Sequence, residues 1–172
     1  MRRGQQAEVP SPGQNRKVPA FGAIDYASGL HVSHVPKTEK GGKNSTQFLT
    51  LLHKLRLRAK RTGRRILLVL DNGPIHTAKC VAIAMKDPQL RECIRLLWLP
   101  KYAPELNEQE RVWKVAKEQG VANVLFKDKD SFRDHVVKVL ESINKRKRGA
   151  LTVMLGQPRR ALRVPKNLRT GT

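Results

Sequence analysis

The sequence predicts an α/β fold built on a mixed sheet, and three observations support this class. Two short runs of unbroken apolar residues, 66–70 and 94–99, are typical of strands buried on both faces of a sheet. Apolar residues at helical spacing lie between and after these runs, which favours parallel strands joined by right-handed helical crossovers. Residues 17–35 predict an antiparallel hairpin beside them, with a turn at 26–29 that ends in a glycine.

Helix and strand signals alternate along the chain. In chain order, the predicted elements are strands 17–25 and 30–35, a helix from Asn44 or Ser45 to about 61, a strand 64–70, a helix 76–85 that ends at Asp87-Pro88, a strand 94–99, a helix 107–119 and a helix 130–147. We expect one domain over 18–147, an extended lead-in over 1–17, and a basic, flexible tail over 148–172.

The composition limits the class of protein. The chain has 172 residues, with 35 Lys and Arg against 14 Asp and Glu, which gives a formal net charge of +21. Such an excess favours a polyanionic partner. Two cysteines are too few for a disulfide scaffold, and no apolar run is long enough for a signal peptide or a membrane span. We therefore expect a cytoplasmic protein.

The charge is concentrated at the two ends of the chain. Residues 1–65 carry 14 basic and 3 acidic side chains, residues 66–140 carry 12 and 10, and residues 141–172 carry 9 and 1. A solvated surface with a disordered tail would explain this pattern. The alternative is an acidic chemical centre between basic surfaces that bind phosphates.

Acidic residues follow both buried strands. Asp71 comes directly after the strand that ends at Leu70, at the carboxyl end where α/β sheets bind ligands. Its alternative role is to cap a turn or the next helix. Glu110 lies in the first turn of a helix that follows the second strand, and Asn107-x-x-Glu110 also fits a capping box.

Taken together, the two acidic residues suggest a metal site. Parallel neighbouring strands bring Asp71 and the helix that carries Glu110 to the same edge of the sheet, and converging carboxylates suit hard divalent cations. A pair of such cations supports phosphodiester displacement. Lys114 and Lys117, four and seven residues after Glu110, are candidates to contact phosphates, although each also fits a solvated helix face.

The segments Asp71-Asn72-Gly73-Pro74-Ile75-His76 and Leu99–Trp113 resemble the catalytic domain of bacterial insertion-sequence transposases of the Tc/mariner superfamily. The resemblance runs from about residue 7 to 143. It implies a ribonuclease H-like fold and an Asp-Asp-Glu triad that binds two Mg²⁺ or Mn²⁺ ions. It also implies cutting of DNA at transposon ends and joining of the freed 3′-hydroxyl to target DNA. The second Asp of the triad corresponds to Asp71 and the Glu to Glu110, with 38 residues between them.

This chain departs from the family pattern in two ways. Glu108 stands where the family usually has proline. In addition, the first triad Asp of the family lies on a strand before the hairpin, and a helix-turn-helix region lies further upstream. We therefore expect an N-terminally truncated catalytic domain that lacks the first strand and is inactive, or nearly so, by itself. Asp25 fits ordinary turn chemistry better than a replacement for the missing acid.

The resemblance also implies partners. Double-stranded DNA is the expected partner, with Lys101, Lys114 and Lys117 as candidate contacts. A homo-oligomer or a complementing N-terminal fragment is possible, and the expected location is the bacterial cytoplasm, associated with the nucleoid. The alternative function is a non-catalytic, basic DNA-binding remnant of a transposase. His76 is expected to be satisfied locally at a helix start, and Trp98 and Trp113 are expected in the core.

Overall fold

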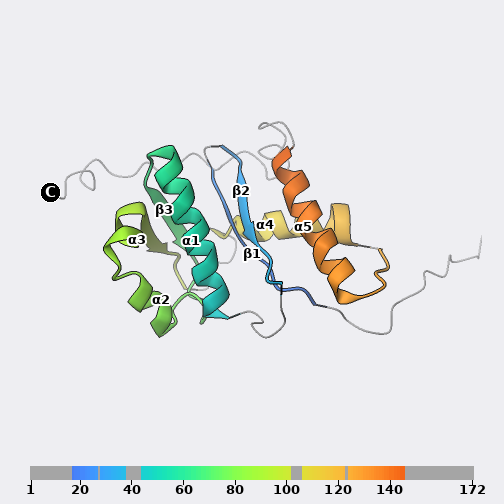
Figure 1. The fold of residues 1–172 in the computed structure, drawn as a ribbon, viewed down its shortest axis with the longest axis horizontal. Coiled ribbons are helices and arrows are strands. Elements are labelled where there is room, and N and C mark those ends of the chain that lie inside the picture. The colour runs from blue at the N-terminus through green and yellow to red at the C-terminus, as the bar shows by residue number, and fades with distance from the viewer. Residues whose placement is uncertain (1–16, 27, 38–43, 102–105, 123, 146–172) are drawn as a thin grey trace, which may run out of the picture.

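The computed structural model describes residues 17–26, 28–37, 44–101, 106–122 and 124–145, and Figure 1 shows their arrangement. The predicted α/β class is confirmed. The elements are β1 (Phe21–Ile24), β2 (His31–His34), α1 (Ser45–Thr62), β3 (Ile66–Leu70), α2 (Lys79–Ala84), α3 (Pro88–Cys93), β4 (Ile94–Trp98), α4 (Gln109–Ala116), the π-helical segment η3 (Lys117–Val121) and α5 (Lys129–Lys145).

The strands form two separate pairs within the described residues, one antiparallel and one parallel, and not the single mixed sheet that the sequence predicted. β1 and β2 make the predicted antiparallel hairpin, in which Phe21 faces His34, and Gly29 takes a positive φ of 66° at the turn. β3 and β4 run parallel, in a register that places Leu70 opposite Trp98. The parallel register brings the carboxyl ends of β3 and β4 together at one edge, as the sequence predicted.

α1 begins and ends where its capping residues place it. The side chain of Asn44 accepts a hydrogen bond from the backbone N–H of Gln47, and Gly63 takes a φ of 64° at the C-cap. Such residues are typical of the start and the end of a helix, respectively. The apolar face of α1 is buried at Phe48, Leu51, Leu52, Leu55 and Ala59.

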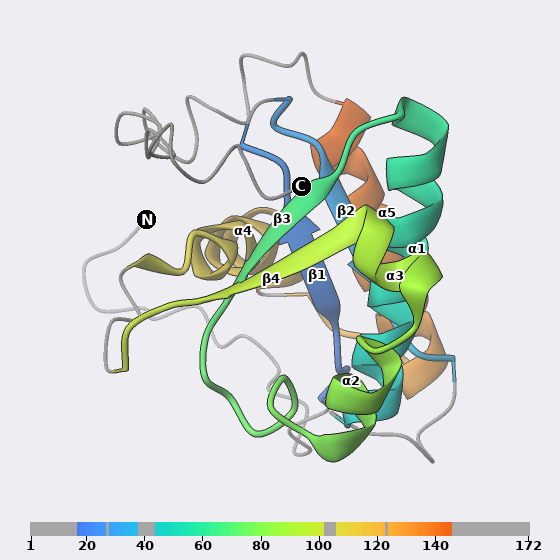
Figure 2. The same cartoon turned by 90° about the vertical axis from the view of Figure 1, so that its left-hand side faces the viewer.

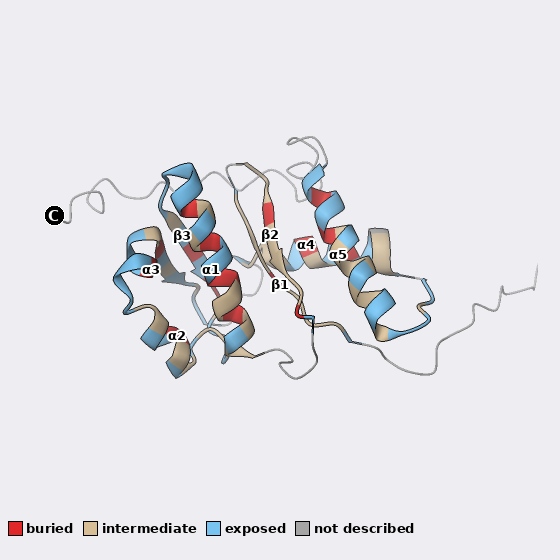
Figure 3. Cartoon of the chain, viewed as in Figure 1, coloured by how far each residue is buried: buried red, intermediate tan, exposed pale blue. Residues whose placement is uncertain are grey.

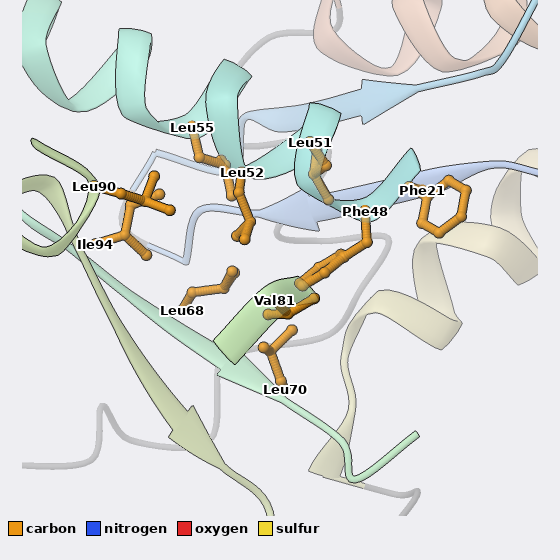
Figure 4. Close-up of a cluster of buried hydrophobic side chains, with 10 residues drawn as sticks. All are labelled: Phe21, Phe48, Leu51, Leu52, Leu55, Leu68, Leu70, Val81, Leu90 and Ile94. Carbon is orange, nitrogen blue, oxygen red and sulfur yellow. The ribbon is translucent and has the colours of Figure 1, made fainter. Parts of the chain in front are cut away.

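The larger of two apolar clusters lies between α1 and the parallel pair. Side chains from α1, β3, β4, α2, α3 and β1 point toward one another there (Figure 4). Leu52 of α1 is completely buried, and Ile94 at the start of β4 is 2% exposed. The cluster therefore fixes α1 on one face of β3 and β4.

A second apolar cluster lies on the other face of the hairpin. It joins Val112 and Ala116 of α4 to Leu140 and Ile143 of α5, with Ile24 packed against it. α1 packs against the hairpin from one side, and α4 and α5 pack against it from the other (Figure 3). The hairpin is thus the middle layer that connects the two clusters.

The expectation that both apolar strands are buried on both faces is wrong for the described residues. Leu67 and Val69 of β3 are 48% and 40% exposed, and Leu97 of β4 is 44% exposed. Alternate residues of a strand point to opposite faces, and only the face of Leu68 and Leu70 is covered by described helices. Trp98, predicted in the core, is also 41% exposed.

The segment after Asp71 differs from its prediction. The backbone N–H groups of His76 and Thr77 both donate to the carbonyl of Gly73, which makes a turn rather than a helix start. α2 therefore begins at Lys79 and not at residue 76. α3 was not predicted: Asp87 accepts from Gln89 N–H as its N-cap, and Pro88 at the first helical position needs no N–H partner.

α4 covers only the first part of the helix predicted over 107–119, and η3 continues it. The predicted helix 130–147 is α5, which ends at Lys145 in the described residues. The predicted basic tail over 148–172 and all of the predicted lead-in except Lys17 lie outside the described residues. Within the part that the structure describes, no helix is both long and apolar enough to cross a membrane.

Candidate active site at the end of β3

Asp71 lies where β3 ends, at the junction with β4. Leu99 N–H donates to the carbonyl of Leu70 at 2.7 Å, and the side-chain amide of Asn72 donates to the carbonyl of Leu99 at 2.7 Å. These bonds hold the two strand ends together on both sides of Asp71. Gly73 N–H donates to Oδ1 of Asp71 at 2.9 Å. The carboxylate therefore also caps the turn that follows β3, which is the alternative role that the sequence suggested for Asp71.

Asn107 connects this carboxylate to the start of α4. Its Nδ2 donates to Oδ2 of Asp71 at 3.3 Å, across 36 positions of the sequence. Its Oδ1 accepts from Gln109 N–H at 3.2 Å, and its carbonyl accepts from Glu110 N–H at 3.1 Å. One residue therefore holds the first turn of α4 against the end of β3, as expected from adjacent parallel strands.

Glu110 lies in the first turn of α4, three residues after Asn107, and its side chain is exposed. The capping box Asn107-x-x-Glu110, the alternative role of Glu110, is not formed. The N-cap residue of α4 is Glu108, and its side chain makes no capping hydrogen bond. The helix start is instead satisfied by Asn107. The carboxylate of Glu110 is therefore available to solvent.

His76 completes the surroundings of Asp71. Its Nε2 lies 3.6 Å from Oδ1 of Asp71, and its ring packs edge-on to Phe48 with a centroid separation of 4.4 Å. Burial lowers the pKa of His76, and the charge of Asp71 opposes this effect only in part. Its Nδ1 is buried with no hydrogen-bond partner among the described residues, so the expected local satisfaction of His76 is incomplete.

The carboxylate ligands at this site are of the kind that a divalent metal prefers, but two of them are too few to hold the ion. Asp71 and Glu110 offer carboxylate oxygens, which hard cations prefer, and the side chain of Asp71 is 48% exposed. Among the described residues, however, no three His, Cys, Asp or Glu side chains are grouped closely enough to hold a metal ion. A complete site needs at least one further ligand.

The three predicted phosphate contacts all lie at exposed positions. Lys101 follows β4, Lys114 is in α4, and Lys117 begins η3. Lys114 lies 4.0 Å from Glu118 and is 75% exposed, so it pairs weakly with an acid one turn away. Their exposure fits both interpretations of these lysines, as phosphate contacts or as part of a solvated surface.

Two features of the site could not be read from the sequence. One is the bond from Asn107 to Asp71. The other is a buried network in which Nε2 of His31 lies 3.0 Å from Nε2 of Gln109, the residue before Glu110. Asn144 of α5 clamps the backbone of His31, donating to its carbonyl at 2.7 Å and accepting from its N–H at 2.8 Å. The only sequence signal was a histidine within the short strand predicted over 30–35.

Asp25 is a turn residue, as predicted. Its carboxylate accepts from the hydroxyl of Ser28 at 2.6 Å and pairs with Arg58 at 3.2 Å. These contacts place it in the hairpin turn, where it stabilises the link between β1 and β2.

Comparison with known proteins gives a family match and several relatives. The family model described as "DDE superfamily endonuclease" matches residues 1–133. The "Insertion element IS630 uncharacterized 39 kDa protein" of Shigella sonnei is 32% identical over 112 residues, which is 65% of this chain and 30% of that protein. The "Uncharacterized protein y4pE/y4sA" of Sinorhizobium fredii (strain NBRC 101917 / NGR234) is 34% identical over 73 residues, which is 42% of this chain and 49% of that protein.

The chain thus spans less than half the length of these two curated relatives. Among solved structures, the crystal structure of the catalytic core domain of BIV integrase matches with a TM-score of 0.49 and 20% identity. That match covers 76% of this chain and 78% of the other chain.

Proposed function

The chain belongs to the DDE superfamily endonuclease family, and from this membership we propose that it is part of the catalytic domain of an insertion-sequence transposase. Its chemistry would be metal-dependent phosphodiester hydrolysis and strand transfer on DNA. The family match, the insertion-element relative and the α/β architecture support the predicted ribonuclease H-like assignment. The observation that carries the proposal is the hydrogen bond between Asn107 and Asp71, which joins the two acidic segments.

In this proposal, Asp71 and Glu110 are the catalytic and metal-binding carboxylates of this chain. Together with a further ligand, Asp71 and Glu110 would hold Mg²⁺ or Mn²⁺, which would supply activation of the attacking oxygen and stabilisation of the leaving oxygen of a phosphodiester. Asn107 orients Oδ2 of Asp71 and leaves Glu110 free at the surface. His76 lies against Oδ1, the other carboxylate oxygen of Asp71.

DNA would lie across this edge, with Lys101, Lys114 and Lys117 contacting its phosphates. Their exposure supports this role, because an ammonium group that is free to move can follow a phosphate backbone. A homo-oligomer or a complementing N-terminal fragment would supply the further acid. The expectation that this polypeptide alone cuts DNA poorly remains a prediction.

The first experiment tests whether the two carboxylates bind divalent ions together. We expect Mn²⁺ to raise the thermal unfolding midpoint of the full chain, because a ligand that binds only the folded state stabilises it. Asp71→Asn and Glu110→Gln should each abolish most of this increase. The readout is the midpoint with and without Mn²⁺, measured by differential scanning fluorimetry.

Glu118→Gln is the matched control, since Glu118 is an exposed acid two turns further along the same helical segment. It should respond to Mn²⁺ as the unmodified chain does. If Mn²⁺ stabilises Asp71→Asn and Glu110→Gln as much as the unmodified chain, the carboxylates do not share a metal site. The alternative of a non-catalytic DNA-binding remnant would then be favoured.

A further inference from the structure

A second positively charged surface lies at the C-terminal half of α1 and does not belong to the site of Asp71. Between residues 45 and 65 the chain has no acidic residue and seven basic ones. The seven are Lys54, Arg56, Arg58, Lys60, Arg61, Arg64 and Arg65. This run of like charge on one helix and the turn after it is costly unless an anion compensates it.

Part of this surface is a hollow between α1 and β2. Its volume is about 250 Å³, and its lining combines apolar and cationic side chains, namely Leu30, Val32, Lys54, Leu57, Arg58 and Arg61. Leu57 is 61% exposed in it, although it is aliphatic. A lining that combines apolar and cationic side chains suits a sugar-phosphate chain, whose deoxyribose is weakly polar and whose phosphate is charged.

The charges of this surface differ in how they are satisfied. Arg58 pairs with Asp25 at 3.2 Å, and Lys54 donates to the carbonyl of Ser33 at 2.9 Å. In contrast, Arg61, Arg64 and Arg65 are exposed and make no ion pair or side-chain hydrogen bond within the described part of the chain. Three guanidinium groups are therefore available to an external anion.

The position of the surface separates it from the carboxylate site. Arg64 and Arg65 directly precede β3, whereas Asp71 directly follows it. Five strand residues therefore lie between them, about 16 Å along the strand. Figure 2 shows this separation, with α1 leading into one end of β3 and the loop toward α2 leaving the other.

We propose that the surface formed by Arg61, Arg64 and Arg65, together with the neighbouring hollow, binds the phosphodiester backbone of duplex DNA at a place distinct from the carboxylate site. The choice of DNA as the polyanion rests on the proposed function, but the surface itself does not depend on Asp71 or Glu110. Arginine forks bind phosphate oxygens in pairs, which suits backbone contact without sequence readout.

The test measures DNA affinity of the full chain in EDTA, so that divalent ions contribute nothing. The probe is a fluorescent random-sequence duplex, followed by anisotropy at several salt concentrations. For a triple variant with Arg61→Ala, Arg64→Ala and Arg65→Ala, we expect a loss of affinity of roughly tenfold or more. The slope of log affinity against log salt should also fall by up to about 3, since each phosphate contact contributes about 0.9.

A second triple variant, with Lys79→Ala, Lys86→Ala and Lys127→Ala, removes the same charge from exposed positions elsewhere. It should change the slope by less than about 1. Equal losses in the two triple variants would overturn the proposal, because only net charge would then matter. Unchanged DNA binding by the arginine triple variant would also overturn it, and would point to an acidic protein partner for this surface.

The outcome is separable from the test of the carboxylate site. The arginine triple variant should keep the Mn²⁺-dependent rise of the unfolding midpoint that the unmodified chain shows, because its substitutions lie at the other end of β3 from Asp71. A failed Mn²⁺ experiment therefore leaves this inference standing, and a failed arginine experiment leaves the metal site standing. Because the three arginines are exposed, their replacement should leave the unfolding midpoint nearly unchanged, which confirms that each triple variant is folded.

Discussion

His31 shows how a single residue connects the candidate site to the rest of the protein. It lies on β2, is 1% exposed, and contacts Gln109 of α4 and Asn144 of α5. Trp113 packs edge-on to its ring at a centroid separation of 5.5 Å. A Cβ atom at Gly22 would come within 2.4 Å of its Nε2, so the neighbouring strand needs a glycine at this position. His31 therefore fixes the start of α4, next to Glu110.

The buried imidazole should make folding stability depend on pH. Burial lowers the pKa of His31 to about 4, against 6.5 for the exposed group, so the fold favours the neutral ring. This contribution is fully present above pH 6.5 and is lost as the pH falls from 6.5 toward 4. The loss is about 3 kcal/mol in the free energy of unfolding. Urea unfolding at a series of pH values measures it.

A variant isolates this effect from the titration of the carboxylates. The glutamine of His31→Gln does not titrate in this range. In this variant, the free energy of unfolding should therefore decrease less between pH 6.5 and 4, by most of the loss of about 3 kcal/mol that is assigned to His31. His53→Gln, at an exposed histidine on α1, should keep the decrease of the unmodified chain. A parallel pH profile for His31→Gln and the unmodified chain would show that His31 is not responsible.

At the scale of the element, the two ends of α1 are set by its capping residues, Asn44 and Gly63. Asn44 accepts from Gln47 N–H at 3.0 Å and so satisfies one of the free donors at the helix start. Asn44→Ala should lower the free energy of unfolding by about 1 kcal/mol, and Asn44→Asp should retain most of it. Chemical denaturation of the two variants measures the difference. Equal losses in both variants would mean that the cap bond is not what stabilises this end.

At the scale of the whole molecule, the parallel pair has one covered and one uncovered face in the described residues. Leu67, Val69 and Leu97 lie on the uncovered face, and all three are at least 40% exposed. Contiguous exposed apolar residues on a sheet favour association.

This face should determine how the chain associates. Val69→Lys should reduce self-association in sedimentation velocity and change the free energy of unfolding by less than about 1 kcal/mol. Leu68→Lys, one residue away but 7% exposed, should unfold the chain, because it buries a charge in the core. If Val69→Lys unfolds the chain as Leu68→Lys does, the face is covered in solution.

The sequence predicted most elements because their signals are local. The spacing of apolar residues identified α1, and the unbroken apolar runs identified β3 and β4. Errors occurred where tertiary context decides. Apolar residues alone do not show whether a second layer covers Leu67 and Val69. The error at α3 was local instead: Pro88 was interpreted as the end of one helix and not as the first residue of the next.

By itself, the sequence determined the order of the strands and of the longer helices, the place of Asp71 at a strand end and the place of Glu110 in a first helical turn, because these follow from periodicity and capping within a few residues. Only the tertiary structure decided that Asn107 bonds to Asp71 rather than closing a capping box with Glu110. It also decided that His31 anchors α4. Such contacts join residues far apart in the chain, and their partners are selected by packing, which no local pattern encodes.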